Sequence, residues 1–205
     1  MNSFSATKSA LLLVDLQNDF IHPRGAYGRA GVRSNAISAL PRRLKPVADT
    51  IRSAGGCVIS THFTLIPSKN GTPFISSHLQ EIRPFLGKGD FQSKTWGHEL
   101  VELLQPADFT IEKISFSAFY QSRLEWVLNQ SGISTLIFGG IVTDGGIATT
   151  VRSAHVREFE NIVLSDGCAA FSNDIHENSI SSLSKVANIC SSAEMIKIIT
   201  ESSTP

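Results

Sequence analysis

Short, continuous apolar runs recur along the chain, and each is followed by polar residues or by glycines. The run at residues 10–14, Ala-Leu-Leu-Leu-Val, ends directly at Asp15. Further runs lie at residues 57–60, 109–111, 135–138 and 161–164, with a weaker one at 188–190. A strand that is apolar on both faces is typical of the interior of a parallel sheet covered by helices. The runs therefore predict the strands of an α/β protein.

The segments between these runs carry helical periodicity or turn residues. From residue 34 to 53, apolar residues recur at helical spacing, and Pro41 and Pro46 are expected to kink or interrupt that helix. A short helix is expected over residues 96–104, and the Ser-Arg-Leu-Glu motif at 122–125 predicts a capping box for the next helix. Strands that alternate with helices indicate a parallel sheet with helices on both faces.

Length and composition narrow the class of protein. A chain of 205 residues suits one α/β domain that spans residues 1–205. The 18 basic and 18 acidic residues balance, which argues against a nucleic-acid partner and favours self-association, so a dimer or tetramer is expected. The apolar run at 10–14 is too short to cross a membrane. Three scattered cysteines form neither a disulfide framework nor a zinc pattern, which favours a cytoplasmic location.

Parallel sheets bind ligands beyond the carboxyl ends of their strands. This rule selects Asp15, His62 and Lys113, each near the end of a predicted strand, and the glycine-rich turn at 143–146. A carboxylate beside an ammonium group can transfer a proton while the cation stabilises negative charge. The same two groups could equally form a structural ion pair, and the sequence leaves both interpretations open.

The stretch Phe-Gly-Gly-Ile-Val-Thr-Asp-Gly-Gly-Ile at residues 138–147 joins a strand to a helix. The free N–H groups at such a helix start, together with the positive end of the helix dipole, favour an anion or a developing oxyanion. A hydrolase built on this plan would carry a nucleophile at the position of Gly146. A glycine at a helix start can also serve close packing alone.

The order and spacing of several motifs resemble the isochorismatase-like hydrolases, a family also called the cysteine hydrolases. The resemblance extends over nearly the whole chain. It rests on residues 12–20, on Lys113 with 117–119, and on 124–125, 140–144 and 166–169. It implies a hydrolase that acts on a small molecule and folds as a three-layer α/β/α sandwich around a six-stranded parallel sheet, commonly in oligomers.

The resemblance also implies the roles of individual residues. Asp15 and Lys113 match the aspartate and lysine of the family's catalytic triad, whereas Gly146 takes the place of the nucleophilic cysteine. A cis peptide bond is implied between Ile141 and Val142, with the N–H groups of Val142 and Gly146 as an oxyanion hole. Isochorismatases of the family also carry glycine at the nucleophile position. An engineered replacement of a natural cysteine is a further alternative at the level of sequence.

Three functions are compatible with this pattern. Vinyl-ether hydrolysis of the isochorismate type, with protonated Asp15 as general acid, is the leading prediction because isochorismatases share the glycine. One alternative is amide or ureide hydrolysis by water with Asp15 as general base, since the Thr-Asp pair at 143–144 resembles the amidohydrolase branch of the family. The other alternative is a non-catalytic protein that binds a small molecule. No metal or cofactor is predicted. The expected substrate-binding residues are Phe20, His62, Val142, Thr143 and Gly145.

Overall fold

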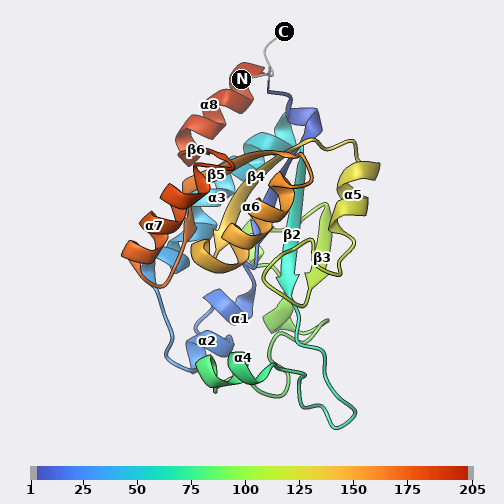
Figure 1. The fold of residues 1–205 in the computed structure, drawn as a ribbon, viewed down its shortest axis with the longest axis vertical. Helices are drawn as coiled ribbons and strands as arrows, with labels where there is room; N and C mark the ends of the chain where they lie inside the picture. Colours follow the sequence, from blue (N-terminus) through green and yellow to red (C-terminus); the bar gives the residue numbers. More distant parts are fainter. Residues whose placement is uncertain (1–3, 203–205) are drawn as a thin grey trace.

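The computed structural model describes residues 4–202 as a three-layer α/β/α sandwich around a six-stranded sheet (Figure 1). All neighbouring strands are parallel, in the spatial order β3-β2-β1-β4-β5-β6. The predicted fold class is confirmed, and the weak sixth strand is present. The strands are β1 (Ser9–Val14), β2 (Cys57–Phe63), β3 (Phe109–Lys113), β4 (Thr135–Ile141), β5 (Glu160–Ala169) and β6 (Asn188–Cys190).

Helices cover both faces of the sheet. The main ones are α3 (Asn35–Ser53), α5 (Leu124–Gln130), α6 (Ala148–His155), α7 (Asn173–Leu183) and α8 (Ser192–Ser202). On one face, Leu11 and Leu13 of β1 pack in a buried cluster with α3 and α8. On the other face, Leu12 packs in a second cluster with α5, α6 and α7. In Figure 1, α6 lies in front of the sheet and α3 behind it.

The strand β1 lies at the centre of the sheet, between β2 and β4, and all of its residues are buried. Its side chains alternate between the two helical layers, which explains why the run is apolar at every position rather than at every second one. The chain leaves the sheet at Asp15, which has a φ of 57°. Asp15, one of the polar residues predicted at strand ends, therefore lies at the carboxyl end of the central strand.

Two helix predictions differ from the structure. The helix α3 continues through Pro41 and Pro46 without the interruption that the sequence suggested. Each proline removes one N–H donor, but the buried apolar side of the helix keeps it packed on the sheet. Residues 96–104 form two short 3₁₀ turns, η2 (Trp96–His98) and η3 (Glu102–Leu104), in place of one helix.

The predicted capping box at residues 122–125 is wrong. The helix α5 starts at Leu124, and its N-cap residue Arg123 makes no side-chain capping bond. Ser122 Oγ instead accepts a hydrogen bond from the Leu124 N–H at 3.1 Å. The glutamate of the motif, Glu125, accepts a hydrogen bond from Arg157 Nε at 2.7 Å and so ties α5 to the end of α6.

The strand β5 is longer than the apolar run at residues 161–164 suggested. It continues to Ala169 past a shift in register, which lies opposite Phe138 and Gly140 of β4. Cys168 is buried inside this added stretch, and its Sγ–H donates to Phe138 O at 3.6 Å. Burial raises the pKa of the Cys168 thiol to about 12, so this cysteine packs in the core as an uncharged group.

Residues 67–94 form a long excursion that lies beyond the carboxyl end of the sheet. They contain α4 (Ser77–Ile82), which lies beside α1 (Asn18–Ile21) and α2 (Ala26–Arg29) below the strand ends in Figure 1. Phe91 is fully buried in an apolar cluster that joins this segment to α2. The excursion therefore forms one side of any site at the strand ends.

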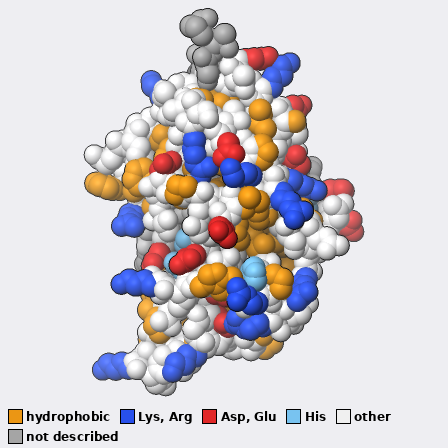
Figure 2. Space-filling model, turned by 180° about the vertical axis from the view of Figure 1, so that it is seen from behind, with side chains coloured by type: hydrophobic (Ala, Val, Ile, Leu, Met, Phe, Trp, Pro, Cys, Tyr) orange, Lys and Arg blue, Asp and Glu red, His pale blue; other side chains and the backbone are white. Residues whose placement is uncertain are grey.

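The surface carries both signs of charge. On the face shown in Figure 2, Lys and Arg side chains are interspersed with Asp and Glu, and hydrophobic side chains form a band between them. This mixture agrees with the equal numbers of acidic and basic residues in the sequence. Among the helices within residues 4–202, none combines the length and the apolar character that crossing a membrane requires.

Candidate active site

Asp15 and Lys113 form a buried ion pair at the carboxyl edge of the sheet. Lys113 Nζ lies 2.7 Å from Asp15 Oδ2, and only 1% and 7% of the two side chains are exposed. The pair joins the ends of two strands that are not neighbours, since Asp15 follows β1, Lys113 ends β3, and β2 lies between them. Lys113 Nζ also donates to Ser115 O at 2.9 Å, and Thr61 Oγ1 donates to Asp15 Oδ1 at 3.3 Å. Both charged groups are therefore fixed in position.

Burial controls the protonation of the carboxyl group. Loss of water raises the pKa of Asp15 above its usual 3.8, while the charge of Lys113 and the hydrogen bonds from Lys113 and Thr61 act in the opposite direction. The net direction is upward, because the carboxyl group is enclosed by protein. A carboxyl group with a raised pKa is a stronger base when it is ionised, and its protonated form persists to higher pH. Asp15 is therefore suited to proton transfer in either direction.

The glycine-rich turn after β4 passes close to the end of the central strand. Gly140 pairs with Val14 at a φ of +133°, and a Cβ at this position would lie 2.1 Å from Val14 O, so only glycine fits. The peptide bond between Ile141 and Val142 is cis. The chain then forms a π-helical turn, η4 (Thr143–Ile147), which leads into α6.

Gly146 lies directly beside the carboxylate. A Cβ at this position would lie 3.2 Å from Asp15 Oδ2 and 2.8 Å from Ile141 O. The second distance is too short for an unstrained contact with a backbone oxygen, so the turn is packed around a glycine. The structure thus brings together Asp15, Lys113 and Gly146, the residues that the sequence predicted as catalytic.

A cavity of about 250 Å³ opens onto the ion pair. Five of the predicted site residues line it, namely Asp15, Phe20, Lys113, Val142 and Gly146. Further walls come from the α4 region of the excursion and from aromatic side chains. The additional aromatic residues are Tyr27, Phe63, Phe116 and Phe171. A cavity of this size, apolar for the most part and with a few converging polar groups, suits a small molecule.

His62, predicted to bind substrate, does not line this cavity. Its Nε2 lies 2.9 Å from Ser60 Oγ, and its ring packs edge-on against His98 with centroids 5.0 Å apart. Burial lowers the pKa of His62 to about 3, so the ring is neutral. Successive strand residues point to opposite faces, and it is Phe63 that faces the cavity. His62 does lie near the end of β2, as predicted, but this position does not specify to which face of the sheet its side chain points.

Thr143 and Gly145 belong to the turn but also lie outside the lining of the cavity. Thr143 Oγ1 lies 2.8 Å from His176 Nδ1, a contact that joins η4 to α7. A Cβ at Gly145 would lie 3.0 Å from Val142 Cγ2 and 3.4 Å from the Phe116 ring. These two predicted substrate-binding residues therefore support the turn, whereas Val142 and Gly146 face the cavity.

Three residues that complete the walls were not among the predicted site residues, namely Tyr27, Arg83 and Phe171. Tyr27 OH accepts a hydrogen bond from Arg83 Nε at 2.9 Å, and the Tyr27 ring stacks on Phe171 with centroids 5.8 Å apart. They come from α2, from the residue after α4 and from the loop after β5. In the sequence these residues appear only as aromatic or basic residues among turn residues, a pattern that is too common to predict a site.

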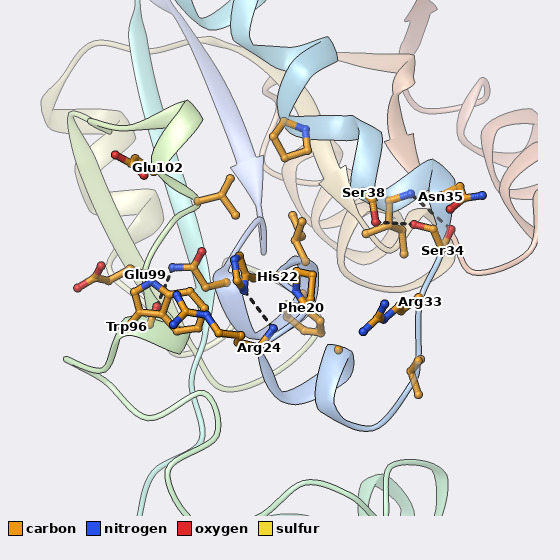
Figure 3. A pocket seen from close by; sticks show the side chains of 18 of the residues that line it. Phe20, His22, Arg24, Arg33, Ser34, Asn35, Ser38, Trp96, Glu99 and Glu102 are labelled. Atoms are coloured by element: carbon orange, nitrogen blue, oxygen red, sulfur yellow. Dashed lines mark hydrogen bonds between the residues drawn. The ribbon is translucent and has the colours of Figure 1, made fainter.

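A second cavity, of about 780 Å³, lies away from the ion pair. Figure 3 shows Arg33 and the start of α3 on one side of it, opposite Trp96 and Glu99. The two cavities share Phe20 and Phe171, but none of the three catalytic candidates lines the larger one. The buried Asp15–Lys113 pair and Gly146 line only the smaller cavity, so we assign the candidate active site to that cavity.

Comparison of the sequence with known proteins identifies a matching family model and several relatives. The family model of the isochorismatase domain matches residues 9–195. The ureidoacrylate amidohydrolase RutB of Yersinia enterocolitica is 31% identical over 180 residues, which cover 80% of this chain and 76% of that protein. RutB of Caulobacter vibrioides is 30% identical over 174 residues, which cover 77% and 75% of the two chains.

Solved structures show the same fold. A cysteine hydrolase from Pseudomonas syringae pv. phaseolicola superposes with a TM-score of 0.84 at 21% identity, covering 98% of this chain and 97% of that one. The N-carbamoylsarcosine amidase from Thermoplasma acidophilum has a TM-score of 0.71 at 22% identity, with coverage of 90% and 96%. At these identities the likeness concerns the architecture of the chain.

Proposed function

Because the chain belongs to the isochorismatase family of hydrolases, we propose that it hydrolyses the amide or ureide group of a small molecule with water as nucleophile. The observation that carries the proposal is the position of Asp15 Oδ2, 2.7 Å from Lys113 Nζ and 3.2 Å from where a Cβ of residue 146 would lie. A water molecule attacking from the Gly146 side would lie within hydrogen-bonding reach of this oxygen. The ureidoacrylate amidohydrolase relatives support the substrate class.

The reaction begins when the ionised carboxylate of Asp15 accepts a proton from water and the water oxygen bonds to the carbonyl carbon. The carbonyl electrons move to oxygen, where the N–H groups of Val142 and Gly146 stabilise the oxyanion. The intermediate then collapses, the C–N bond breaks, and Asp15 returns its proton to the leaving nitrogen. Burial raises the pKa of Asp15, which suits both transfers. Lys113 keeps the carboxylate in place.

Hydrolysis of a vinyl ether of the isochorismate type is a second candidate. It is favoured by Gly146, which isochorismatases share, and by the upward shift in the pKa of Asp15, since this reaction needs a protonated carboxyl group. Asp15 would donate its proton to the vinyl carbon, water would add to the resulting oxocarbenium ion, and pyruvate would leave. It ranks second because the relatives described above carry amidohydrolase names.

Incubation with isochorismate and with a panel of amides and ureides, including ureidoacrylate, tests both candidates when ammonia and pyruvate are assayed in parallel. We expect ammonia release, and we expect Asp15→Asn to reduce it at least about 100-fold, because a general base contributes about that much or more. Asp49→Asn is the matched control, since Asp49 forms an exposed ion pair with Lys45 on α3. Pyruvate without ammonia would favour the second candidate, and full activity in Asp15→Asn would contradict both.

A further inference from the structure

The charges that line the active-site cavity do not balance. Asp15 and Lys113 neutralise each other at 2.7 Å. Arg83 lines the same cavity, and among residues 4–202 no carboxylate forms an ion pair with it. With His78 counted as neutral, the lining carries one net positive charge when Asp15 is ionised and two when it is protonated. An anionic group on a ligand would therefore be attracted to the cavity.

The guanidinium group of Arg83 is held in place before any ligand arrives. Its Nε donates to Tyr27 OH at 2.9 Å, and its Nη1 donates to Ile82 O at 2.8 Å. The Cζ atom lies 5.7 Å from the centre of the Tyr27 ring and 5.9 Å from that of Phe171. Arginine stacked on aromatic rings keeps its charge and loses little further freedom when it binds an anion.

Part of this group is still available for binding. Arg83 Nη2 makes no hydrogen bond within the part of the chain that the structure describes. Arg29 of α2, by contrast, already forms an ion pair with Asp90. A planar guanidinium group with a free edge matches the geometry of a carboxylate, and such charge-assisted hydrogen bonds are among the strongest in proteins. Arg83, Asp15 and Lys113 line the same cavity of about 250 Å³, so one small ligand can contact all three.

We propose that Arg83 binds a carboxylate on the substrate, so that the enzyme selects small, planar amides or ureides that carry a carboxylate away from the scissile bond. The planar part would pack against the aromatic walls formed by Phe20, Tyr27 and Phe171. A cavity of about 250 Å³ limits the substrate to roughly the size of one aromatic ring with two substituents. This inference rests on the proposed function for the position of the scissile group, but carboxylate binding by Arg83 can be measured without turnover.

The test uses two probes of nearly equal shape, benzoate and its neutral methyl ester, with binding measured by calorimetry. We expect Arg83→Gln to weaken benzoate binding at least about tenfold, through loss of charge-assisted hydrogen bonds, and to leave methyl benzoate binding unchanged. Arg83→Lys should recover part of the loss, since it restores the charge without the planar fork. Arg33→Gln removes the same charge from an exposed residue outside this cavity and should change neither affinity.

Two results would overturn the proposal. One is benzoate binding that is absent in the wild type at about 10 mM, or equal in the wild type and Arg83→Gln. The other is an equal loss for both probes, which would mean that the substitution disturbs the aromatic walls instead. Ammonia assays separate this proposal from the proposed function. Arg83-dependent benzoate binding without hydrolysis of any amide would refute the function alone, whereas hydrolysis of a carboxylated amide with an unchanged KM in Arg83→Gln would refute the carboxylate site alone.

Discussion

At the scale of the residue, Gly146 occupies a position where any side chain meets fixed backbone. A Cβ there would lie 2.8 Å from Ile141 O. We expect Gly146→Ala to lower the free energy of unfolding by about 1–3 kcal/mol, because overpacking outweighs the gain of up to about 1 kcal/mol that alanine brings to a helix. In the control Gly145→Ala, the Cβ would meet only side-chain atoms at 3.0 Å or more. Urea unfolding measures both, and equal losses would contradict this account.

At the scale of the element, β2 presents Phe63 to the active-site cavity and buries His62 elsewhere. Burial and the neighbouring His98 lower the pKa of His62 from 6.5 to about 3. Below pH 6.5 His62 therefore binds a proton in the unfolded chain but stays neutral in the folded chain, so the free energy of unfolding falls as the pH drops. We expect His62 to contribute a loss of up to about 1.4 kcal/mol per pH unit, or about 2 kcal/mol between pH 6.5 and 5.

The substitution His62→Gln tests this contribution through a slope rather than through stability itself. The variant should lose less stability than the wild type between pH 7 and pH 5, whatever its stability at pH 7. His155→Gln, at the exposed end of α6, should keep the slope of the wild type. The two slopes come from urea unfolding at each pH, and an unchanged slope in His62→Gln would show that the buried ring does not resist protonation.

At the scale of the whole molecule, α5 and the edge strand β3 both carry exposed hydrophobic side chains, and Arg123 at the start of α5 donates a hydrogen bond to Thr110 O of β3. Trp126 of α5 is 66% exposed and Phe109 at the start of β3 is 41% exposed. We expect sedimentation to detect a dimer or tetramer, and Trp126→Glu to shift it toward the 22.2 kDa monomer. Val156→Glu, at a residue 74% exposed after α6, is the control. A wild-type monomer at every concentration would contradict this prediction.

The strands, their parallel arrangement and the three catalytic candidates could be predicted from the amino-acid sequence. Strands buried on both faces must be apolar at every position, so the runs are visible without any knowledge of their neighbours. Asp15, Lys113 and the turn that contains Gly146 follow predicted strands, and parallel strands bring their carboxyl ends to one edge of the sheet. The same rule also selected His62, and it was the resemblance to the family that implied catalytic roles for Asp15, Lys113 and Gly146.

Tertiary structure alone decided which other side chains meet these three. Whether His62 or Phe63 faces the cavity depends on how β2 pairs with its neighbours, which a short apolar run does not specify. Tyr27, Arg83 and Phe171 meet through contacts between segments far apart in the chain. Such contacts are set by packing and charge across the folded molecule rather than by local periodicity, and therefore leave no pattern in the sequence.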